Sequence, residues 1–262
     1  MIKRHFIDLP AGTIHCAIAG SGQPLLLLHQ TPRSWDEYRD VLPLLGRHFK
    51  AIAMDTLGYG DSSKPLPVRD SIELWAEVAL ALADALGLAQ FGVVGHHTGA
   101  AIAIELAAAF PQRITAAVLS APPWVDAERR ARHARPSRID NVPRQSDGSH
   151  LTELWRIRQP WYPAGDIDLL ERFVVDAVKA GPRAAEGHAV VARYVMEARL
   201  PLVRCPVLVI APTADPHAFP HARRVADAIA GARVAEVEGG MVPLPDQMPE
   251  RFAELVTGFM RT

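Results

Sequence analysis

One short stretch of this sequence has the residue types and spacing of a reactive turn. In "FGVVGHHTGAAIAIELA" (91–107) an apolar run ends between Gly95 and Gly99, and an Ala/Ile-rich segment with helical spacing follows. This pattern predicts a nucleophile elbow, a sharp strand-to-helix turn that lifts one side chain above a sheet. The tip ordinarily holds Ser, Cys or Asp, but here it holds His97. An imidazole at that place could act as a general base or attack a carbonyl carbon directly, and we favour the base.

The elements that must position this turn alternate along the chain. Residues 5–20 read as a hairpin, and apolar runs predict strands at 24–29, 49–55, 91–96, 114–124, 205–215 and 233–240. Helical spacing occupies 34–46, 70–87, the segment after the elbow, 221–232 and 246–261. Strands that alternate with helices predict an α/β fold, with a mostly parallel sheet flanked by helices on both faces.

One interval interrupts this alternation. Residues 125–198 begin with "VDAERRARHARPSR", become rich in Pro and Gly, and then turn helical. We expect them to form a helical cap inserted after the sixth strand, over the carboxyl ends of the strands, where open α/β sheets bind ligands. The expected organisation is therefore a core domain of residues 1–124 and 199–262, with residues 125–198 as the cap.

At this point the sequence resembles the α/β-hydrolase fold superfamily over nearly its whole length. "LLLLHQTPRSW" stands in the place of the His-Gly oxyanion loop, "MDTLGYGDSSKP" resembles the Asp-x-x-Gly-x-Gly-x-Ser segment, and "VVGHHTGA" matches the elbow. "VLVIAPTADP" matches the strand that delivers the catalytic acid, at Asp215, and "VEGGMVPLPDQMPERF" matches the loop that delivers the catalytic histidine. The resemblance implies the fold, but the site departs from the Ser-His-Asp pattern.

Two of the three triad positions are altered, because His97 is at the nucleophile position and Met241 at the histidine position. A methionine thioether has no basic nitrogen, so acyl-enzyme chemistry of the serine type is excluded at this place. Our hypothesis is that the longer imidazole of His97 fills the space left by the missing ring and donates to Asp215. This dyad would fix the tautomer of the ring and make its other nitrogen a better base, for hydrolysis or for a lyase or isomerase step.

Several residues are expected to line the substrate site. The backbone N–H of Thr98 and that of Thr31 or Gln30 would form an anion hole that stabilises negative charge on a carbonyl substrate. Trp124 and Met241 are further candidates for contact with the substrate. We expect no cofactor and no metal, since His29, His96 and His97 on tight turns point in different directions.

Alternative interpretations stay open at this stage. The site could be retired, leaving a binding protein for a small molecule, or the changes Met241→His and His97→Ser together could restore ordinary esterase activity. The basic cluster that begins the cap is read as a solvated face, with a gate for an anionic substrate as the alternative. Its members are Arg129, Arg130, Arg132, Arg135 and Arg138.

Composition narrows the partners. The 262 residues are 49% hydrophobic with a net charge of -1, which fits one soluble domain and gives no general attraction to nucleic acid or anionic membranes. We see no signal peptide and no apolar run of the ~18 residues that a membrane span needs. Cys16 and Cys205 are expected to be reduced thiols, which indicates a cytoplasmic protein. The expected partner is a small-molecule substrate or ligand. Self-association as a homo-oligomer stays open.

Overall fold

The computed structural model describes residues 1–68, 70–132 and 139–261. Their centre is an eight-stranded sheet with the strand order β1-β2-β4-β3-β5-β6-β7-β8. The strands are β1 (Lys3–Leu9), β2 (Gly12–Ala19), β3 (Pro24–Leu28), β4 (Lys50–Met54), β5 (Phe91–His96), β6 (Ile114–Ser120), β7 (Val207–Pro212) and β8 (Arg233–Val237). Strand β2 pairs antiparallel with β1 and with β4, and all other neighbours are parallel. The expected α/β class and mostly parallel sheet are confirmed.

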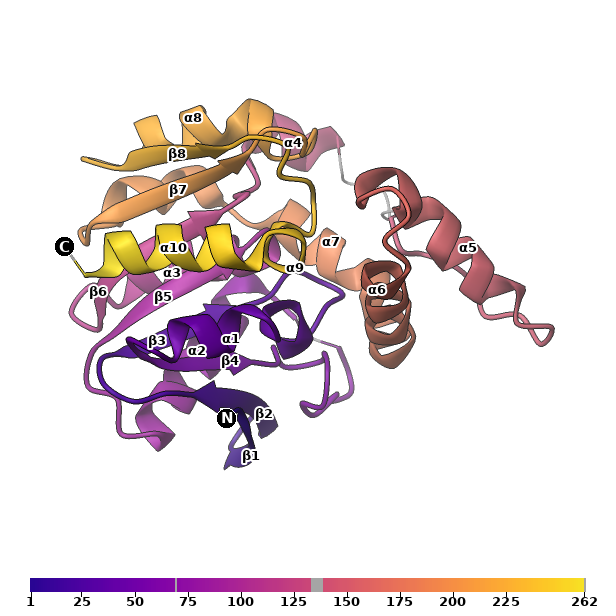
Figure 1. The fold of residues 1–262 in the computed structure, drawn as a ribbon, viewed down its shortest axis with the longest axis horizontal. Helices are drawn as coiled ribbons and strands as arrows, with labels where there is room; N and C mark the ends of the chain where they lie inside the picture. The colour runs from indigo at the N-terminus through magenta and orange to yellow at the C-terminus, as the bar shows by residue number, and fades with distance from the viewer. Residues whose placement is uncertain (69, 133–138, 262) are drawn as a thin grey trace.

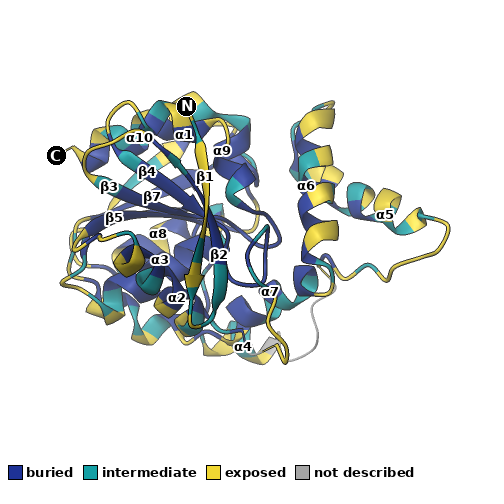
Figure 2. Cartoon of the chain, turned by 90° about the horizontal axis from the view of Figure 1, so that it is seen from below, coloured by how far each residue is buried: buried dark blue, intermediate teal, exposed yellow. Residues whose placement is uncertain are grey.

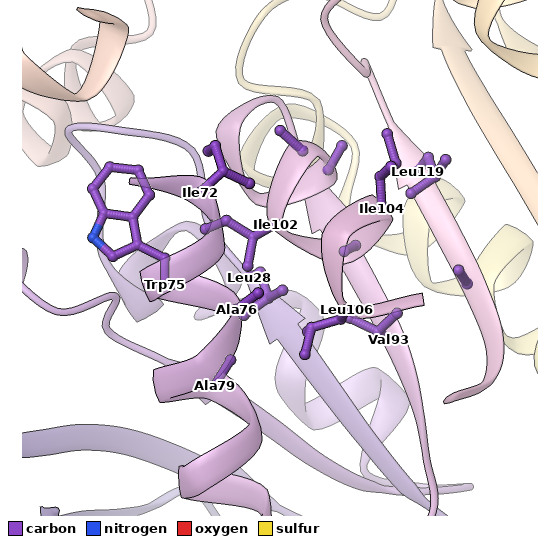
Figure 3. Close-up of a cluster of buried hydrophobic side chains, with 14 of the residues drawn as sticks. Leu28, Ile72, Trp75, Ala76, Ala79, Val93, Ile102, Ile104, Leu106 and Leu119 are labelled. Atoms are coloured by element: carbon purple, nitrogen blue, oxygen red, sulfur yellow. The ribbon is translucent and has the colours of Figure 1, made fainter. Parts of the chain in front are cut away.

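Helices cover both faces of the sheet (Figure 1). Helices α2 (Ile72–Ala85), α3 (Thr98–Ala109) and α8 (Phe219–Asp227) pack on one face, and α1 (Val41–Leu45) and α10 (Pro249–Met260) on the other. The first face has the larger buried cluster, part of which Figure 3 shows, with Ile72 of α2 on the side of Ile102 and Leu28. Burial of such side chains contributes about 1.5–3 kcal/mol each, so this layer fixes where α3 and the elbow before it lie.

Two expected helices are shorter than their periodic patterns. Residues 34–46 divide into a 3-10 turn (Trp35–Tyr38) and α1, and residues 246–261 into α9 (Leu244–Gln247) and α10. A proline causes each break, because its ring clashes with the carbonyl four residues earlier. Pro43 prevents α1 from extending back to residue 39, and Pro249 can only begin α10.

In the described part of the chain, four α-helices follow β6 before the chain returns to the sheet at β7. They are α4 (Ala127–Arg132), α5 (Ser149–Arg158), α6 (Ile167–Ala180) and α7 (Arg183–Arg193). Figures 1 and 2 show α5 and α6 standing off from one end of the sheet, with α7 between them and the core. Helices α5 and α6 share a small apolar cluster of their own, which includes Leu154, Tyr162 and Phe173.

Buried ion pairs fasten α6 to the core. The Arg33 side chain, which is fully buried, donates from Nε to Asp176 of α6 at 2.8 Å and from Nη1 to Asp246 at 2.6 Å. Arg172 of α6 pairs with Asp36 at 2.7 Å and with Asp246 at 2.8 Å. Removing one partner from such a network leaves an uncompensated buried charge, so α6 is held firmly in place. None of the helices in the described ranges is long and apolar enough to cross a membrane.

Candidate functional site

The elbow between β5 and α3 has the strained backbone that its sequence predicts. His97 has φ 46° and ψ −108°, outside the regions that side chains with a Cβ prefer. Two glycines make the turn feasible. A methyl group on Gly95 would lie 2.1 Å from the Gly99 carbonyl oxygen, and one on Gly99 would lie 1.9 Å from that of Leu28. Only residues without a Cβ allow strand and helix to approach this closely.

The tip of the elbow faces the acid at the end of β7. His97 Nε2 lies 2.8 Å from Asp215 Oδ2, with the His97 side chain 17% exposed and that of Asp215 fully buried. The distance is that of a hydrogen bond, but the two atoms are not aligned as donor and acceptor. The described residues offer His97 Nδ1 no hydrogen-bond partner. The ring therefore presents Nε2 to the acid and keeps Nδ1 for other contacts.

Backbone amides hold the Asp215 carboxylate in place. Its Oδ1 accepts hydrogen bonds from the amides of His217 at 2.9 Å and Ala218 at 3.2 Å. Burial alone raises the pKa of this carboxyl, but the His97 ring and the His217 amide outweigh it and hold the pKa at about 2. Asp215 is thus ionised wherever the protein is folded at neutral pH.

The low pKa of Asp215 predicts a loss of stability in acid. The group has a pKa of about 2 in the fold against 3.8 ordinarily, so the unfolded chain binds its proton more tightly. The stabilisation is present above about pH 4 and is lost as pH falls toward about 2, on the order of 2 kcal/mol. Urea unfolding at pH 5, 3.5 and 2.5 measures it. The Asp215→Asn variant should show a smaller decline than wild type, and an equal decline would contradict the assignment.

A cavity of about 370 Å³ lies over the elbow, between the carboxyl ends of the strands and helices α5 and α7. Four residues predicted for the site contribute to its wall: Gln30, Thr31, His97 and Thr98. The inserted helices and the loop after β7 supply most of the rest, including Asp140, Arg158, Trp161, His188 and His217. The volume is within the range of small-molecule sites.

Two predicted contact residues lie elsewhere. The Trp124 indole donates to Asp126 at 2.7 Å, and the Arg224 guanidinium lies 4.1 Å from the centre of its ring, so this side chain is occupied outside the cavity wall. Met241 is also outside the wall, with its amide donating to Gln247 Oε1 at 2.7 Å. The next residue, Val242, takes the place in the wall that was expected of Met241.

Gln30 departs from its expected role although it borders the cavity. Its backbone N–H donates to Glu37 Oε2 at 2.9 Å, and its side-chain Nε2 donates to Glu37 Oε1 at 2.6 Å. The buried Glu37 carboxyl thus takes the donors that an anion hole would need. This corrects the expectation for Gln30, and the polar Gln at a position usually held by Gly is explained by this internal partner.

Thr31 and Thr98 have backbone N–H groups that remain unpaired within the described part of the chain, unlike the N–H of Gln30. Their hydroxyl oxygens are 2.9 Å apart, which joins the loop after β3 to the start of α3. Neither backbone N–H has an acceptor among the residues that the structure describes. The Thr98 N–H also lies in the first turn of α3, where the helix dipole favours negative charge.

The histidines next to these residues have structural partners. His29 donates from Nδ1 to the Gln30 carbonyl at 2.8 Å and accepts at Nε2 from the Thr56 amide at 2.9 Å. His96 contacts the Ser120 hydroxyl at 2.9 Å and the Val242 carbonyl at 2.8 Å. Burial lowers the pKa of both rings. With both nitrogens of each ring engaged, neither His29 nor His96 is available as a metal ligand or a base.

The inserted segment and the loop after β7 contribute further residues to the wall. The His217 ring packs edge-on against Trp161, with centroids 4.7 Å apart, and burial lowers its pKa. Asp140, Arg158 and His188 form a polar cluster in the wall. His217 could have been expected at the site, because it lies two residues after Asp215 in the chain. The cluster could not, because Asp140, Arg158 and His188 come from three separate segments.

Another group with metal-binding residue types lies outside the cavity. The ligand atoms of His15, Asp55 and Asp61 lie within 4.8 Å of one another. However, His15 contacts Asp55 at 2.9 Å and accepts from Arg4 at 2.9 Å, while Asp61 pairs with Arg4 and Lys179. These charges are already balanced by protein groups, so the arrangement braces a loop.

The thiols and the basic cluster add little to the site. Burial raises the pKa of Cys16 to about 12 and that of Cys205 to about 11, so neither is a reactive thiolate.

Of the basic cluster, Arg130 pairs with Glu197 at 2.7 Å, and Arg129 borders the cavity. Arg135 and Arg138 lie outside the described residues.

Comparison with known sequences supports the fold. A family model described as alpha/beta hydrolase fold matches residues 23–165, more than half of the chain. The soluble epoxide hydrolase of Corynebacterium sp. (strain C12) is 43% identical over 106 residues, which are 40% of this chain and 37% of that protein. The fluoroacetate dehalogenase of Burkholderia sp. is 34% identical over 116 residues, 43% of this chain and 38% of that protein. The matches thus span less than half of these relatives.

Solved structures agree over the full length. A hydrolase from Pseudomonas aeruginosa PA01 superposes with a TM-score of 0.86 at 25% identity, covering 99% of each chain. The enol-lactonase from Burkholderia xenovorans LB400 superposes with a TM-score of 0.82 at 21% identity, over 98% of this chain and all of that one, which is a likeness of fold. Together with the sheet order and the elbow, these findings show that the chain belongs to the alpha/beta hydrolase fold family.

Proposed function

We propose that this protein is an enzyme that acts on a small carbonyl or ester-like molecule, with His97 and Asp215 as its acid/base dyad. The observation that supports this most directly is the 2.8 Å approach of His97 Nε2 to the buried Asp215 carboxylate, with the ring bordering the cavity. Two altered triad positions have thus left a histidine beside an acid. Imidazole chemistry of this kind needs no cofactor.

The His97 ring is oriented the opposite way round from the histidine of a Ser-His-Asp triad. In the triad Nδ1 faces the acid, whereas here Nε2 faces Asp215. With Nε2–H directed at Asp215, the ring has its lone pair at Nδ1, which takes a proton from water or from a carbon next to a carbonyl. The protonated ring, stabilised by the carboxylate, then returns the proton to the leaving group or to the product. The contact is not yet aligned, and such hydrogen bonds often tighten only when substrate binds.

The negative charge that develops on the substrate oxygen needs donors. In this proposal the backbone N–H groups of Thr31 and Thr98 form the anion hole, with the Thr31–Thr98 hydroxyl contact holding the two loops together. Helices α4 to α7 act as the cap, since α5 and α7 contribute much of the cavity wall. A cytoplasmic location accords with two unpaired cysteines.

A panel of small esters, lactones and ketones tests the proposal on the wild-type protein. Hydrolysis is followed by acid release, and proton abstraction by NMR as exchange of α-hydrogens with D₂O. We expect saturable turnover of at least one class without an added cofactor.

The rival is a binding protein that retained the cavity and lost catalysis, which the imperfect alignment of His97 with Asp215 favours. Saturable binding without turnover, unchanged in His97→Ala, would establish the rival in place of the enzyme.

A further inference from the structure

A second histidine–aspartate contact lies in the cavity wall, on the side of the inserted helices. His188 of α7 lies with its Nε2 2.7 Å from Asp140 Oδ2. Arg158, the last residue of α5, donates from Nε to Asp140 Oδ1 at 2.8 Å and from Nη2 to Oδ2. All three residues border the same cavity as His97. The cavity therefore has a reactive pole at the elbow and a charged pole in the inserted helices.

The arginine of this charged pole has donors left over. The pairing with Asp140 uses Nε and Nη2, and the remaining contact of Nη2 is His188 at 3.5 Å. Across the described part of the chain, Nη1 finds no acceptor, and it is not among the sealed polar atoms. Arg158 is only 7% exposed and borders the cavity, which puts its unpaired Nη1 at or near the cavity wall. The Phe173 ring, 4.7 Å from the guanidinium carbon, covers one face and fixes its plane.

The one carboxylate that borders the cavity is already compensated. Among the described wall residues Asp140 is the only carboxylate, and it pairs with the Arg158 guanidinium, while Asp215 lies buried behind His97. Asp140 is already paired with Arg158 and His188, which hold its pKa at about 2 against the effect of burial. The carboxylate therefore stays ionised and occupied by these partners. What the wall offers a ligand is the unused N–H of a guanidinium.

We propose that Arg158, through Nη1, anchors the anionic group of the ligand, and that this group is a carboxylate. Resting on the proposed function, the substrate class then narrows to small carboxylic acids whose reacting carbonyl or ester lies at the other end of the molecule, beside His97. His188 and Asp140 are positioning residues in this proposal, because their contacts fix the Arg158 guanidinium.

The competing explanation is purely structural. Asp140 has a positive φ of 57°, and Arg158 could serve only to hold this turn. A structural role predicts that loss of Arg158 weakens every ligand of the cavity alike. An anchoring role predicts that it weakens anions alone, so a matched pair of acid and amide separates the two.

Calorimetric titration with phenylacetate and phenylacetamide, which differ only in the anionic group, is the test. Wild type should bind the acid at least tenfold more tightly than the amide, because a hydrogen bond to a charged group is worth about tenfold or more. Arg158→Gln should lose that preference and keep its affinity for the amide, while Arg158→Lys retains part of it. Arg156→Gln, on the same helix, exposed and paired with Glu153, is the control and should match wild type.

Equal binding of acid and amide by wild type, or no binding of the acid, overturns the proposal without any variant. A parallel loss of both ligands in Arg158→Gln overturns it as well, in favour of the structural role. Repeating the titration in His97→Ala keeps this proposal apart from the proposed function. The acid preference should persist there. If the wild-type protein shows this preference but turns over no member of the substrate panel, the anchor is upheld and the enzyme is refuted.

Discussion

Asparagine in place of Asp215 is expected to lower kcat/KM by about 10²–10⁴-fold on any substrate that the wild-type protein turns over. The reason lies in the two oxygens of the carboxylate. Oδ1 accepts from the amides of His217 and Ala218, so the amide oxygen of asparagine will take that place. Its NH₂ group then faces His97 Nε2, which must become the acceptor. The ring proton moves to Nδ1, and the base is lost.

The control for this change is Asp227→Asn, an exposed residue in the last turn of α8. It should leave kcat/KM as in wild type. His97→Ala should lose activity over the same range, and the double variant should lose no more than the worse single one, because residues that act as a unit are not additive. Folded Asp215→Asn protein with activity within about threefold of wild type would refute the dyad.

Alanine in place of Gly99 is expected to destabilise the fold by more than about 4 kcal/mol, a large share of the stability of an ordinary domain. The new methyl group would lie 1.9 Å from the carbonyl oxygen of Leu28. The methyl carbon is fixed directly to the α3 backbone, and the oxygen belongs to the backbone of β3, so no side-chain rotation relieves the clash. The helix must move from the sheet and take the elbow with it.

A matched glycine gives the opposite expectation. Gly258 lies within α10, has no atoms within 4 Å of the position of a new Cβ, and has no positive φ. Gly258→Ala should be neutral or stabilise by up to about 1 kcal/mol, since alanine is the better helix former. Urea unfolding followed by circular dichroism compares the two. A Gly99→Ala protein within about 1 kcal/mol of wild type would show that the contact can relax.

Much of this fold could be predicted from local patterns. Apolar runs such as residues 24–28 and the spacing of Gly95 and Gly99 reflect direct steric demands of the sheet and the turn. The helix expected over residues 70–87 begins after Ser71, whose hydroxyl accepts from the Leu74 amide at 3.1 Å as an N-cap. The helix breaks associated with Pro43 and Pro249 are not predicted, because helical periodicity was given more weight than the two prolines. Both prolines are visible in the sequence and argue against a continuous helix.

The site was less predictable, because its wall comes from residues distant in the chain. The approach of His97 to Asp215 was expected from the resemblance to the α/β-hydrolase fold superfamily, in which the elbow and the catalytic acid belong to one site. The engagement of Gln30 by Glu37, seven residues on, depends on how the loop turns inward. The cluster of Asp140, Arg158 and His188 joins a loop and two helices, and no spacing in the sequence predicts that these residues are in contact.

The imidazole at the tip of the elbow has a consequence for how such proteins are discovered. Covalent reagents that label serine hydrolases phosphonylate or carbamoylate an activated hydroxyl, and the adduct survives because its ester bond is stable. Here the elbow presents a ring nitrogen, whose acyl and phosphoryl adducts are readily lost to water. An inventory of hydrolases compiled with these reagents would pass over this protein, and over any other chain whose elbow carries histidine.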